Sequence, residues 1–422
     1  MTIELERNRR MEDKERKVPK LRFPGFTGDW EQRKLGDIVD IVGGGTPATG
    51  ESLYWNGDID WYSPSEIYDD TIYIEGSLRK ITLDGLNNSS AKILPAYKTI
   101  LFTSRATIGE MAILSKAGCT NQGFQSFIVN EGKIEIYFLF SMKPFIKKYA
   151  IKHASGSTFL EVSKNVLQNM PLFIPCEEEQ KLIAKIFSNM DISITLHQRK
   201  LDDTKKLKNA LLQKMFPKEG SNVPELRFPG CTGAWEQRKL GEIAERVQGN
   251  DGRLDLPTLT ISASKGWLDQ KERFSTNIAG KELKNYTLLE KGQLSYNHGN
   301  SKYAKYGAVF VLHGLNEALV PRVYHSFKVL PSTIPDFIEY YFSTGKLDRE
   351  LGKKITSGAR MDGLLNISFS EFMDINLMVP KKEEQKEIVS ILYSINNIIT
   401  LHQRKLDNMK KLKQSLLQQM FV

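Results

Sequence analysis

Cysteine is scarce in this sequence, and long apolar runs are missing from it. The 422 residues include three cysteines, Cys119, Cys176 and Cys231, which are far apart and odd in number. This usage excludes a disulfide framework, offers no metal-ligand spacing and is typical of a reducing compartment, so we expect a cytoplasmic protein. No apolar run approaches the roughly 18 residues of a membrane-spanning helix, and the charged N-terminus lacks the apolar core of a secretory signal.

The motifs of common enzyme classes are also missing. The sequence has no G-x-x-x-x-G-K-[ST] loop for ATP, no H-E-x-x-H among its six histidines, and no N/D-P-P-Y/F motif of base methyltransferases. Gly43–Ala48 matches G-x-G-x-x-A in form. However, Thr49-Gly50 and the turn at Tyr54–Gly57 do not fit the helix that a dinucleotide site requires, which favours a backbone turn. We therefore expect no catalytic residue and no metal site in this chain.

The charge balance of the chain is basic. It carries 59 lysines and arginines against 50 acidic residues, which gives a formal net charge of +9. Such a balance is compatible with a polyanionic partner such as nucleic acid, although many basic proteins bind none. The length predicts two or three domains, each with a core of its own.

Parts of the sequence are repeated at a fixed spacing of 205 residues. The clearest pair consists of residues 21–38 (LRFPGFTGDWEQRKLGDI) and 226–243 (LRFPGCTGAWEQRKLGEI), which are identical at 15 of 18 positions. An internal repeat of this kind predicts one architecture built twice, with a pseudo-two-fold axis. Further pairs at the same spacing are LHQRKL at 196–201 and 401–406, and EEQKLIAKI at 178–186 with EEQKEIVSI at 383–391.

Between the repeated blocks the two halves differ. Each half contains a turn-rich region of strand-like segments, such as DIDWYSPSEI and TILFTSRATIGEMAIL in the first, where a helix is also predicted near Ile136–His153. We predict an α+β fold with two mixed α/β domains joined by two long antiparallel coiled-coil helices. The predicted parts are a lead-in at 1–18, mixed domains at 19–174 and 218–379, and spacer helices at 175–217 and 380–422.

A long helical stretch follows each mixed domain. In Glu177–Phe216, which has no glycine or proline, seam positions recur at alternating steps of three and four from Phe187 to Met215, and the second copy repeats them from Leu392 to Met420. This is the seam of a coiled coil, and helices of this kind need a partner to be stable. If the two seams pack together over most of their length, the second helix must run back along the first, so we expect an antiparallel spacer of about 60 Å.

The regions that differ hold residues that suit nucleic acid. Arg, Asn and Gln side chains can read base edges, whereas Ser, Thr, Lys and Tyr hold phosphates. The same residues are equally typical of polar turns in a β-rich domain. The candidate DNA contacts of the first half are Thr46, Ser63, Ser65, Ser104, Arg105, Thr107, Asn121, Gln122 and Gln125. Those of the second half are Asn297, His298, Asn300, Lys302, Tyr303, Lys305, Arg322 and Arg360.

With these motifs the chain resembles the specificity subunits of type I DNA restriction–modification enzymes. The resemblance covers nearly the whole of residues 19–422, although the second insert departs from the GGTP and SRATIG pattern of the first. In the second half it rests on the repeated WEQRKLG block and the terminal helix. In the first half it rests on Trp30–Gly36, Gly44–Pro47, Tyr54–Ile59, Asn88–Lys92, Phe102–Gly109 and Thr120–Phe124.

The resemblance implies a non-catalytic subunit that reads double-stranded DNA. Each mixed domain would be a target-recognition domain that reads one half of a split, asymmetric site, and the helical spacer would set the gap between the halves. Two modification (methyltransferase) subunits would bind the repeated regions, and restriction (endonuclease/translocase) subunits would join that core. S-adenosylmethionine would belong to the modification subunits, so we expect no cofactor in this chain and no membrane association.

Two other functions are alternatives from the sequence. A self-contained enzyme acting on DNA would transfer methyl groups from S-adenosylmethionine as the purified chain, and the missing motifs argue against it. A coiled-coil adaptor with incidental basic charge would form a complex that prefers no DNA sequence.

Overall fold

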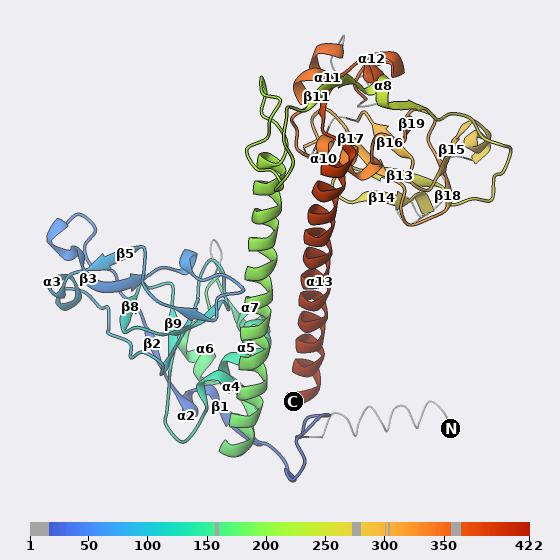
Figure 1. Cartoon of the computed structure of the whole chain (residues 1–422). Coiled ribbons are helices and arrows are strands. Elements are labelled where there is room, and N and C mark those ends of the chain that lie inside the picture. The colour runs from blue at the N-terminus through green and yellow to red at the C-terminus, as the bar shows by residue number, and fades with distance from the viewer. Residues whose placement is uncertain (1–16, 157–159, 272–279, 300, 303, 356–363) are drawn as a thin grey trace, which may run out of the picture. The chain divides into compact units, whose positions relative to one another are not determined.

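The computed structural model describes residues 17–156, 160–271, 280–299, 301–302, 304–355 and 364–422 (Figure 1). They form two compact units. Unit 1 contains the described residues up to Arg199 together with Gln403–Val422, and unit 2 contains Lys200–His402. Each unit therefore combines one mixed α/β region with a part of both long helices, α7 (Glu177–Lys214) and α13 (Lys382–Met420).

Unit 1 is built on a five-stranded sheet in the order β2-β9-β6-β7-β4. A three-stranded sheet, β5-β3-β8, and a two-stranded ladder, β1-β10, belong to the same unit. Its strands are β1 (Glu31–Lys34), β2 (Val39–Gly43), β3 (Trp55–Tyr62), β4 (Tyr73–Ile74), β5 (Arg79–Ile81), β6 (Thr99–Phe102), β7 (Met111–Leu114), β8 (Gly118–Thr120), β9 (Gln125–Val129) and β10 (Pro171–Ile174). Its shorter helices are α2 (Leu35–Ile38), α3 (Leu83–Asn87), α4 (Ile136–Ser141), α5 (Lys143–His153) and α6 (Lys164–Gln168), with 3-10 turns η1 (Ser52–Tyr54) and η2 (Pro64–Glu66).

The helix predicted near Ile136–His153 is present as two consecutive helices. α4 ends at Ser141 and α5 begins at Lys143, with Met142 between them. Pro144 lies in the first turn of α5, where its missing N–H would be unpaired in any case. Inside one continuous helix the same proline would remove a hydrogen bond and clash with the preceding turn. The first helix therefore ends before the proline, and a second helix begins.

Unit 2 is built on a four-stranded sheet in the order β12-β19-β16-β17. Three two-stranded ladders, β11-β20, β13-β14 and β15-β18, lie in the same unit. Its strands are β11 (Glu236–Lys239), β12 (Ala244–Arg246), β13 (Leu259–Ser262), β14 (Gly266–Asp269), β15 (Thr287–Glu290), β16 (Leu294–Asn297), β17 (Ala308–Val311), β18 (Glu317–Val320), β19 (His325–Val329) and β20 (Asn376–Val379). Its shorter helices are α8 (Leu240–Ile243), α10 (Pro335–Ser343), α11 (Asp348–Lys354) and α12 (Phe369–Met373), with a 3-10 turn η3 (Gly280–Asn285).

The main sheets of the two units have the same core topology, although their sequences differ. The orders β2-β9-β6-β7 and β12-β19-β16-β17 correspond strand by strand, and all the pairs within them are antiparallel. The register fixes the equivalence of residues, because Ile100 pairs with Phe127 in unit 1 and Leu294 with Phe327 in unit 2. Ser104 and His298 therefore occupy equivalent positions at the start of equivalent hairpin loops.

The long helices α7 and α13 lie within the stretches predicted as spacers, and they carry the predicted seam. Every seam position from Phe187 to Met215 and from Leu392 to Met420 is buried or partly buried. In unit 1 the ring of Phe187 lies 5.7 Å from that of Phe421, and Asp191 pairs with Lys413 at 2.6 Å. Rising numbers on α7 match falling numbers on α13, so the two segments are antiparallel in this unit, as predicted.

The repeated blocks form matching contacts in the cores of both units. The ring of Trp30 meets Phe421 at 6.2 Å in unit 1, and Trp235 meets Phe216 at 6.0 Å in unit 2. Both contacts are edge-on. Each core is thus closed by the residues at the C-terminal end of a long helix. For unit 1 these residues are the last of the chain.

A seam lysine is present in both units, but the position that carries a carboxylate in unit 1 carries an amide in unit 2. In unit 1 the Tyr137 hydroxyl donates to Asp191 Oδ2 at 2.9 Å, and Lys413 Nζ donates to Asp191 Oδ1 at 2.6 Å. In unit 2 the equivalent of Asp191 is Asn396, which donates to the Tyr340 hydroxyl at 3.0 Å. The equivalent of Lys413 is Lys208, whose pKa is lowered by burial.

We expect the substitution Asn396→Asp to stabilise unit 2. Lys208 and Asn396 line one cavity, so a carboxylate at 396 would offset the burial of the ammonium group. A gain of about 1 kcal/mol would raise the thermal midpoint of the unit by roughly 2–4 °C. The control Asp191→Asn should lower the midpoint of unit 1. Calorimetry checks both, and a lower midpoint for Asn396→Asp would contradict the expectation.

Candidate nucleic-acid interface

One segment of unit 1, residues 120–124, gathers three candidate loops around it. Gly45 N donates to Thr120 O at 2.8 Å, and Asn121 N donates to Tyr62 O at 3.0 Å. Ser104 N donates to Gly123 O at 2.7 Å. These backbone bonds bring three loops next to Asn121 and Gln122. The first loop carries Thr46, the second carries Ser63 and Ser65, and the third carries Arg105 and Thr107. We call this set of loops, residues 44–47, 62–66, 103–109 and 120–124, the unit 1 loop cluster.

The glycines of the first loop allow close packing of backbone. A Cβ at Gly44 would lie 1.9 Å from Asn121 O, and one at Gly45 would lie 2.2 Å from Ala91 N. The loop then places the Thr46 hydroxyl 2.5 Å from Gln122 Oε1. Residues 44–48 have no regular secondary structure, and a turn at 49–50 and the 3-10 turn η1 follow them in place of an α-helix. The glycines serve backbone approach, not a dinucleotide.

The hairpin loop between β6 and β7 presents a shaped, exposed tip. Arg105, Ala106 and Thr107 are exposed, and Ala106 adopts a left-handed backbone conformation with φ of 59°. Thr103 closes the base of the loop, because its hydroxyl accepts from Glu110 N at 2.9 Å and its carbonyl accepts from Gly109 N at 2.9 Å. A non-glycine residue holds this conformation only when its surroundings enforce it.

Charged and polar side chains of the cluster differ in how accessible they are. Arg105 is about half exposed and its Nε lies 2.9 Å from Glu161 Oε1. The Ser63 hydroxyl is 2.8 Å from Glu66 Oε2 and 3.0 Å from the Ser65 hydroxyl. Ser104 Oγ and Gln125 Oε1 are buried and have no hydrogen-bond partner within the described ranges.

The equivalent hairpin of unit 2, between β16 and β17, carries most of the second candidate set. Lys302 and Lys305 are exposed in it, and Arg322 is exposed on the segment before β19. Asn297 is engaged internally, since its Nδ2 donates to Ile261 O at 3.2 Å and its Oδ1 accepts from Gly299 N at 3.1 Å. The candidates Asn300, Tyr303 and Arg360 lie outside the residues that the structure describes.

His298 joins three segments of unit 2. Its Nδ1 lies 2.7 Å from Leu365 O and its Nε2 lies 2.9 Å from Val323 O, and the residue is 3% exposed. Val323 corresponds to Gly123, the acceptor for Ser104 N in unit 1. Both units therefore fix the hairpin loop to the same neighbouring carbonyl, once through a backbone amide and once through an imidazole.

The sequence comparison of the two halves missed this equivalence of the inserts. A weak signal exists, because Gln125-Ser126-Phe127 and His325-Ser326-Phe327 are equivalent and both end in Ser-Phe. Their spacing is 200 residues, whereas the repeated blocks are spaced by 205. A search at the fixed spacing of the repeat therefore does not find it.

Acidification is expected to destabilise unit 2 through His325. Burial lowers the pKa of His325 to about 4, and its Nε2 lies 3.0 Å from Ile367 O. Because the unfolded chain binds this proton near pH 6.5, stability is fully present above pH 6.5. It falls as the pH drops toward 4, by up to about 2–3 kcal/mol. Hydrogen exchange between pH 7 and pH 4.5 checks this, and His325→Phe should remove the unit 2 response. Equal acid sensitivity of that variant and the wild type would contradict it.

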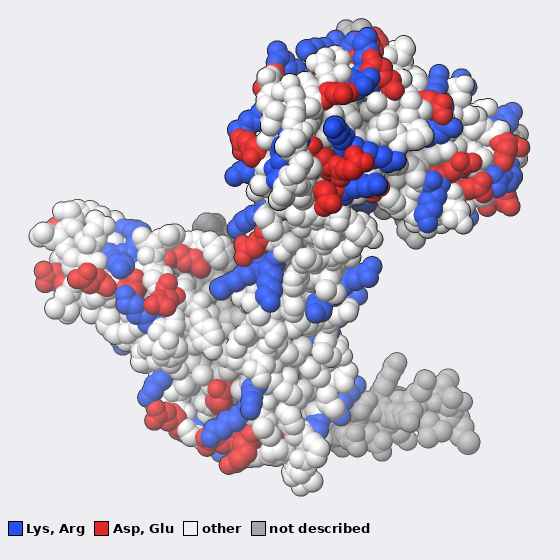
Figure 2. Space-filling model, viewed as in Figure 1, with Lys and Arg blue, Asp and Glu red and all other residues white. Residues whose placement is uncertain are grey.

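The face of each unit that is visible in Figure 2 is mixed in the sign of its charges. Figure 2 shows lysines and arginines interspersed with acidic side chains over the visible face of each unit, without one broad patch of a single sign. On this face, affinity for a polyanion would come from local clusters of basic residues.

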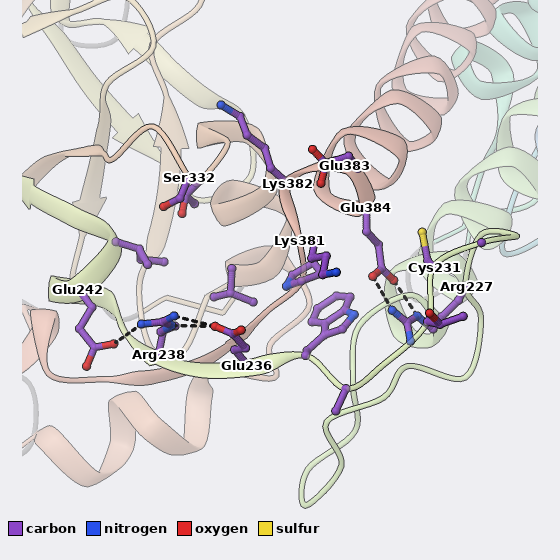
Figure 3. A pocket seen from close by; sticks show the side chains of 18 residues that line it. Arg227, Cys231, Glu236, Arg238, Glu242, Ser332, Lys381, Lys382, Glu383 and Glu384 are labelled. Carbon is purple, nitrogen blue, oxygen red and sulfur yellow. Dashed lines mark hydrogen bonds and ion pairs between the residues drawn. The ribbon is translucent and has the colours of Figure 1, made fainter.

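A cavity of about 650 Å³ lies beside β11 in unit 2 (Figure 3). One wall carries Arg227, which is paired with Glu384, and another carries Arg238, which pairs with Glu236 and Glu242. A cavity of about 640 Å³ lies beside β1 in unit 1, and its lining includes the equivalents of Arg238, Glu236 and Glu242. These equivalents are Arg33, Glu31 and Asp37.

The strands next to these cavities are identical and exposed. β1 and β11 both read EQRK, and all four residues of each strand are exposed. Core packing does not account for identity at exposed positions. Within the described parts of the chain, no helix is long and apolar enough to cross a membrane, and no cluster of three His, Cys, Asp or Glu side chains could hold a metal ion.

Comparison with known proteins yields consistent relatives. The family model described as the type I restriction modification DNA specificity domain matches residues 27–206 and again 233–411. The MjaIX specificity subunit of Methanocaldococcus jannaschii is 27% identical over 421 residues, which covers 92% of each chain. The EcoR124I/EcoR124II specificity subunit of Escherichia coli is 25% identical over 170 residues, or 39% of this chain and 41% of that protein. A type I restriction-modification S subunit from M. genitalium has a similar fold, with a TM-score of 0.60 at 14% identity over 96% of this chain and 99% of that chain.

Proposed function

Because the chain belongs to the type I restriction–modification DNA specificity family, we propose that each of its units reads one half of a bipartite site in duplex DNA. The observation that carries this proposal is the pair of equivalent hairpin loops, β6–β7 and β16–β17. They occupy the same position on related sheets but present different side chains. Equivalent positions with different chemistry are what two readers of unlike half-sites require.

The accessible candidates divide by chemistry into two roles. Arg105 and Gln122 are exposed in unit 1, and Arg322 is exposed in unit 2; these side chains can form the bidentate bonds that distinguish base edges. Lys302 and Lys305 are exposed single charges that suit phosphates. Thr46, Ser63, Ser65, Thr107 and Asn121 complete the proposed interface of unit 1. Ser104, Gln125, Asn297 and His298 support it from within.

We further propose that the repeated blocks hold two copies of one partner. The identical exposed strands β1 and β11 and their matching cavities offer two equivalent surfaces, which suits two modification subunits. Restriction subunits would join that core. S-adenosylmethionine would be bound by the modification subunits, and this chain would contribute no catalytic group.

Exchange of residues 43–170 for the same region of another family member tests the proposal. The full complex with its modification subunits should then modify sites that differ in one half and keep the other half. A change in both halves of the site, or in neither, would contradict the proposal that each unit reads one half. Methyl transfer by the purified chain alone would show instead that it is an enzyme.

A matched pair of variants tests the unit 1 loop cluster. Arg105→Ala should weaken binding of the site by about 1–3 kcal/mol if the guanidinium reads a base. Lys98→Ala changes a basic residue of similar exposure, also ion-paired, that lies outside the cluster and outside the repeated blocks, and it should leave DNA affinity unchanged. Fluorescence anisotropy with the complex measures both, and equal affinity of Arg105→Ala and wild type would assign Arg105 a structural role.

A further inference from the structure

The turn that leads into β5 of unit 1 ends in a strongly exposed leucine. Leu78 is 87% exposed, and the turn begins at Gly76, which has a φ of 77°. An isolated exposed leucine is ordinary on a mobile loop, but this turn is firmly anchored. Leu78 N donates to Glu66 Oε1 at 2.7 Å, and the other oxygen of Glu66 accepts from Ser63 N at 2.7 Å. The carboxylate of Glu66 therefore links this turn, residues 76–78, to the unit 1 loop cluster.

A buried carboxylate holds the other side of the same turn. Asp60 Oδ1 accepts from Ser77 N at 3.1 Å and from Ser77 Oγ at 3.2 Å, and Lys116 lies 2.9 Å from Oδ2. Burial by itself would raise the pKa of Asp60, but the hydrogen bonds from Lys116 and Ser77 hold it below the ordinary value. The anchor is therefore ionised at neutral pH and charge-assisted.

The next residue, Arg79, is exposed and rests on two tryptophans. Its guanidinium carbon lies 3.7 Å from the ring centroid of Trp55 and 5.3 Å from that of Trp61. The two indoles meet edge-on at 5.2 Å. Stacking on aromatic rings fixes the plane of the guanidinium, so that less conformational freedom is lost when its N–H groups form a bidentate bond.

The tryptophans also hold the glycine loop of the cluster. Trp61 Nε1 donates to Gly45 O at 2.8 Å, and Trp55 Nε1 donates to Ala48 O at 3.2 Å. Arg79 is thus one indole ring away from the loop that carries Thr46. The sequence pattern did not indicate Arg79, because the tryptophans that orient it lie 18 and 24 positions earlier in the chain.

We propose that Leu78 and Arg79 are specificity-determining residues of unit 1. The turn that carries them, which adjoins the unit 1 loop cluster, enters a groove of the duplex. Arg79 binds a base edge through its pre-oriented fork, and Leu78 makes apolar contact with bases or sugars beside it. A phosphate contact alone would not use an exposed leucine, since apolar side chains gain from base methyl groups and sugar faces. This inference rests on the proposed function of unit 1.

The test uses the full chain in complex with its modification subunits and a library of duplexes randomised over both half-sites. The variants are Arg79→Gln, Arg79→Lys, Leu78→Ala and the control Leu83→Ala. Leu83 is also an exposed leucine of unit 1, at 63%, and begins α3. Thermal midpoints of all variants are measured alongside.

We expect Arg79→Gln to lose the base preference at one or two adjacent positions of one half-site, with affinity about 5- to 150-fold lower. Arg79→Lys should lose the same preference, because lysine keeps the charge but not the fork. Leu78→Ala should weaken binding at the same positions, and Leu83→Ala should match the wild type. Since Leu78 packs against little, its variant tests the proposal even if an Arg79 variant fails to fold.

Other outcomes separate the inference from its premise. Wild-type preference retained in Arg79→Lys, or loss of affinity that is uniform over all sequences, would overturn the base-reading role. Unchanged DNA binding in Leu78→Ala with loss of a protein subunit from the complex would make the turn a protein contact and overturn the proposal. If the wild-type complex itself prefers no sequence, the proposed function fails, which is a different result from failure of the variants alone.

Discussion

Replacing Arg22 by methionine is expected to destabilise unit 1 by about 3–5 kcal/mol. Arg22 binds Glu179 in a two-bond fork, with Nε to Oε1 and Nη2 to Oε2 both at 2.8 Å. The Glu179 side chain is fully buried. Loss of the guanidinium leaves an uncompensated carboxylate inside the protein, and this desolvation penalty, not the strength of the pair itself, sets the size of the effect.

Three further variants test whether burial of the charge sets the size of the effect. The double variant Arg22→Met/Glu179→Leu removes both charges and should recover most of the lost stability. Arg227→Met breaks the matching pair with Glu384 and should destabilise unit 2 to a similar extent. Arg33→Met removes an exposed pair with Glu31 and should cost less than about 1 kcal/mol. Urea unfolding measures all four free energies, and equal values for Arg22→Met and Arg33→Met would refute the burial argument.

Phe421→Ala is expected to destabilise unit 1 by about 3–5 kcal/mol. Phe421 is 5% exposed, and its ring lies 5.4 Å from that of Phe138, 5.6 Å from Phe145 and 5.7 Å from Phe187. Truncation leaves a cavity between these aromatic rings.

The location of the effect is as informative as its size. Hydrogen exchange should show lost protection in residues 26–42 and 136–150 of unit 1, with unit 2 unchanged. Phe216→Ala should cause lost protection in unit 2 and leave unit 1 unchanged, because Phe216 stacks on Phe337 at 5.5 Å in unit 2. Val422→Ala, at a residue 41% exposed, is the neutral control. Uniform loss of protection over both units after Phe421→Ala would contradict the assignment of the C-terminus to unit 1.

The repeated frame and the long helices were predictable from the sequence. Glu177 is the observed first residue of α7, and the seam positions of both helices are buried or partly buried as predicted. The seam was predictable because side-chain periodicity is set by the geometry of the helix itself. The division between α4 and α5 followed from one residue, Pro144, whose effect is also local.

The candidate interface was predictable in part. Thr46, Arg105 and Gln122 were selected from separate motifs, and the structure brings their loops together through backbone bonds to residues 120–124. Whether they bind DNA remains a prediction. The internal positions of Ser104 and His298 were not visible, because a polar side chain at a loop gives no sign of whether it faces the solvent or a neighbouring carbonyl.

The sequence by itself determined that one frame occurs twice, that each copy ends in a long seamed helix, and which polar loops differ. Tertiary structure alone decided that the dissimilar inserts share a sheet order, that Arg79 rests on Trp55 and Trp61, and that the last residues of the chain complete the core of unit 1. The reason is physical. Helical periodicity and turn residues act over a few positions, and therefore leave a mark in the local sequence. Strand pairing uses backbone groups that every residue carries, and core contacts join residues hundreds of positions apart, so neither leaves such a mark.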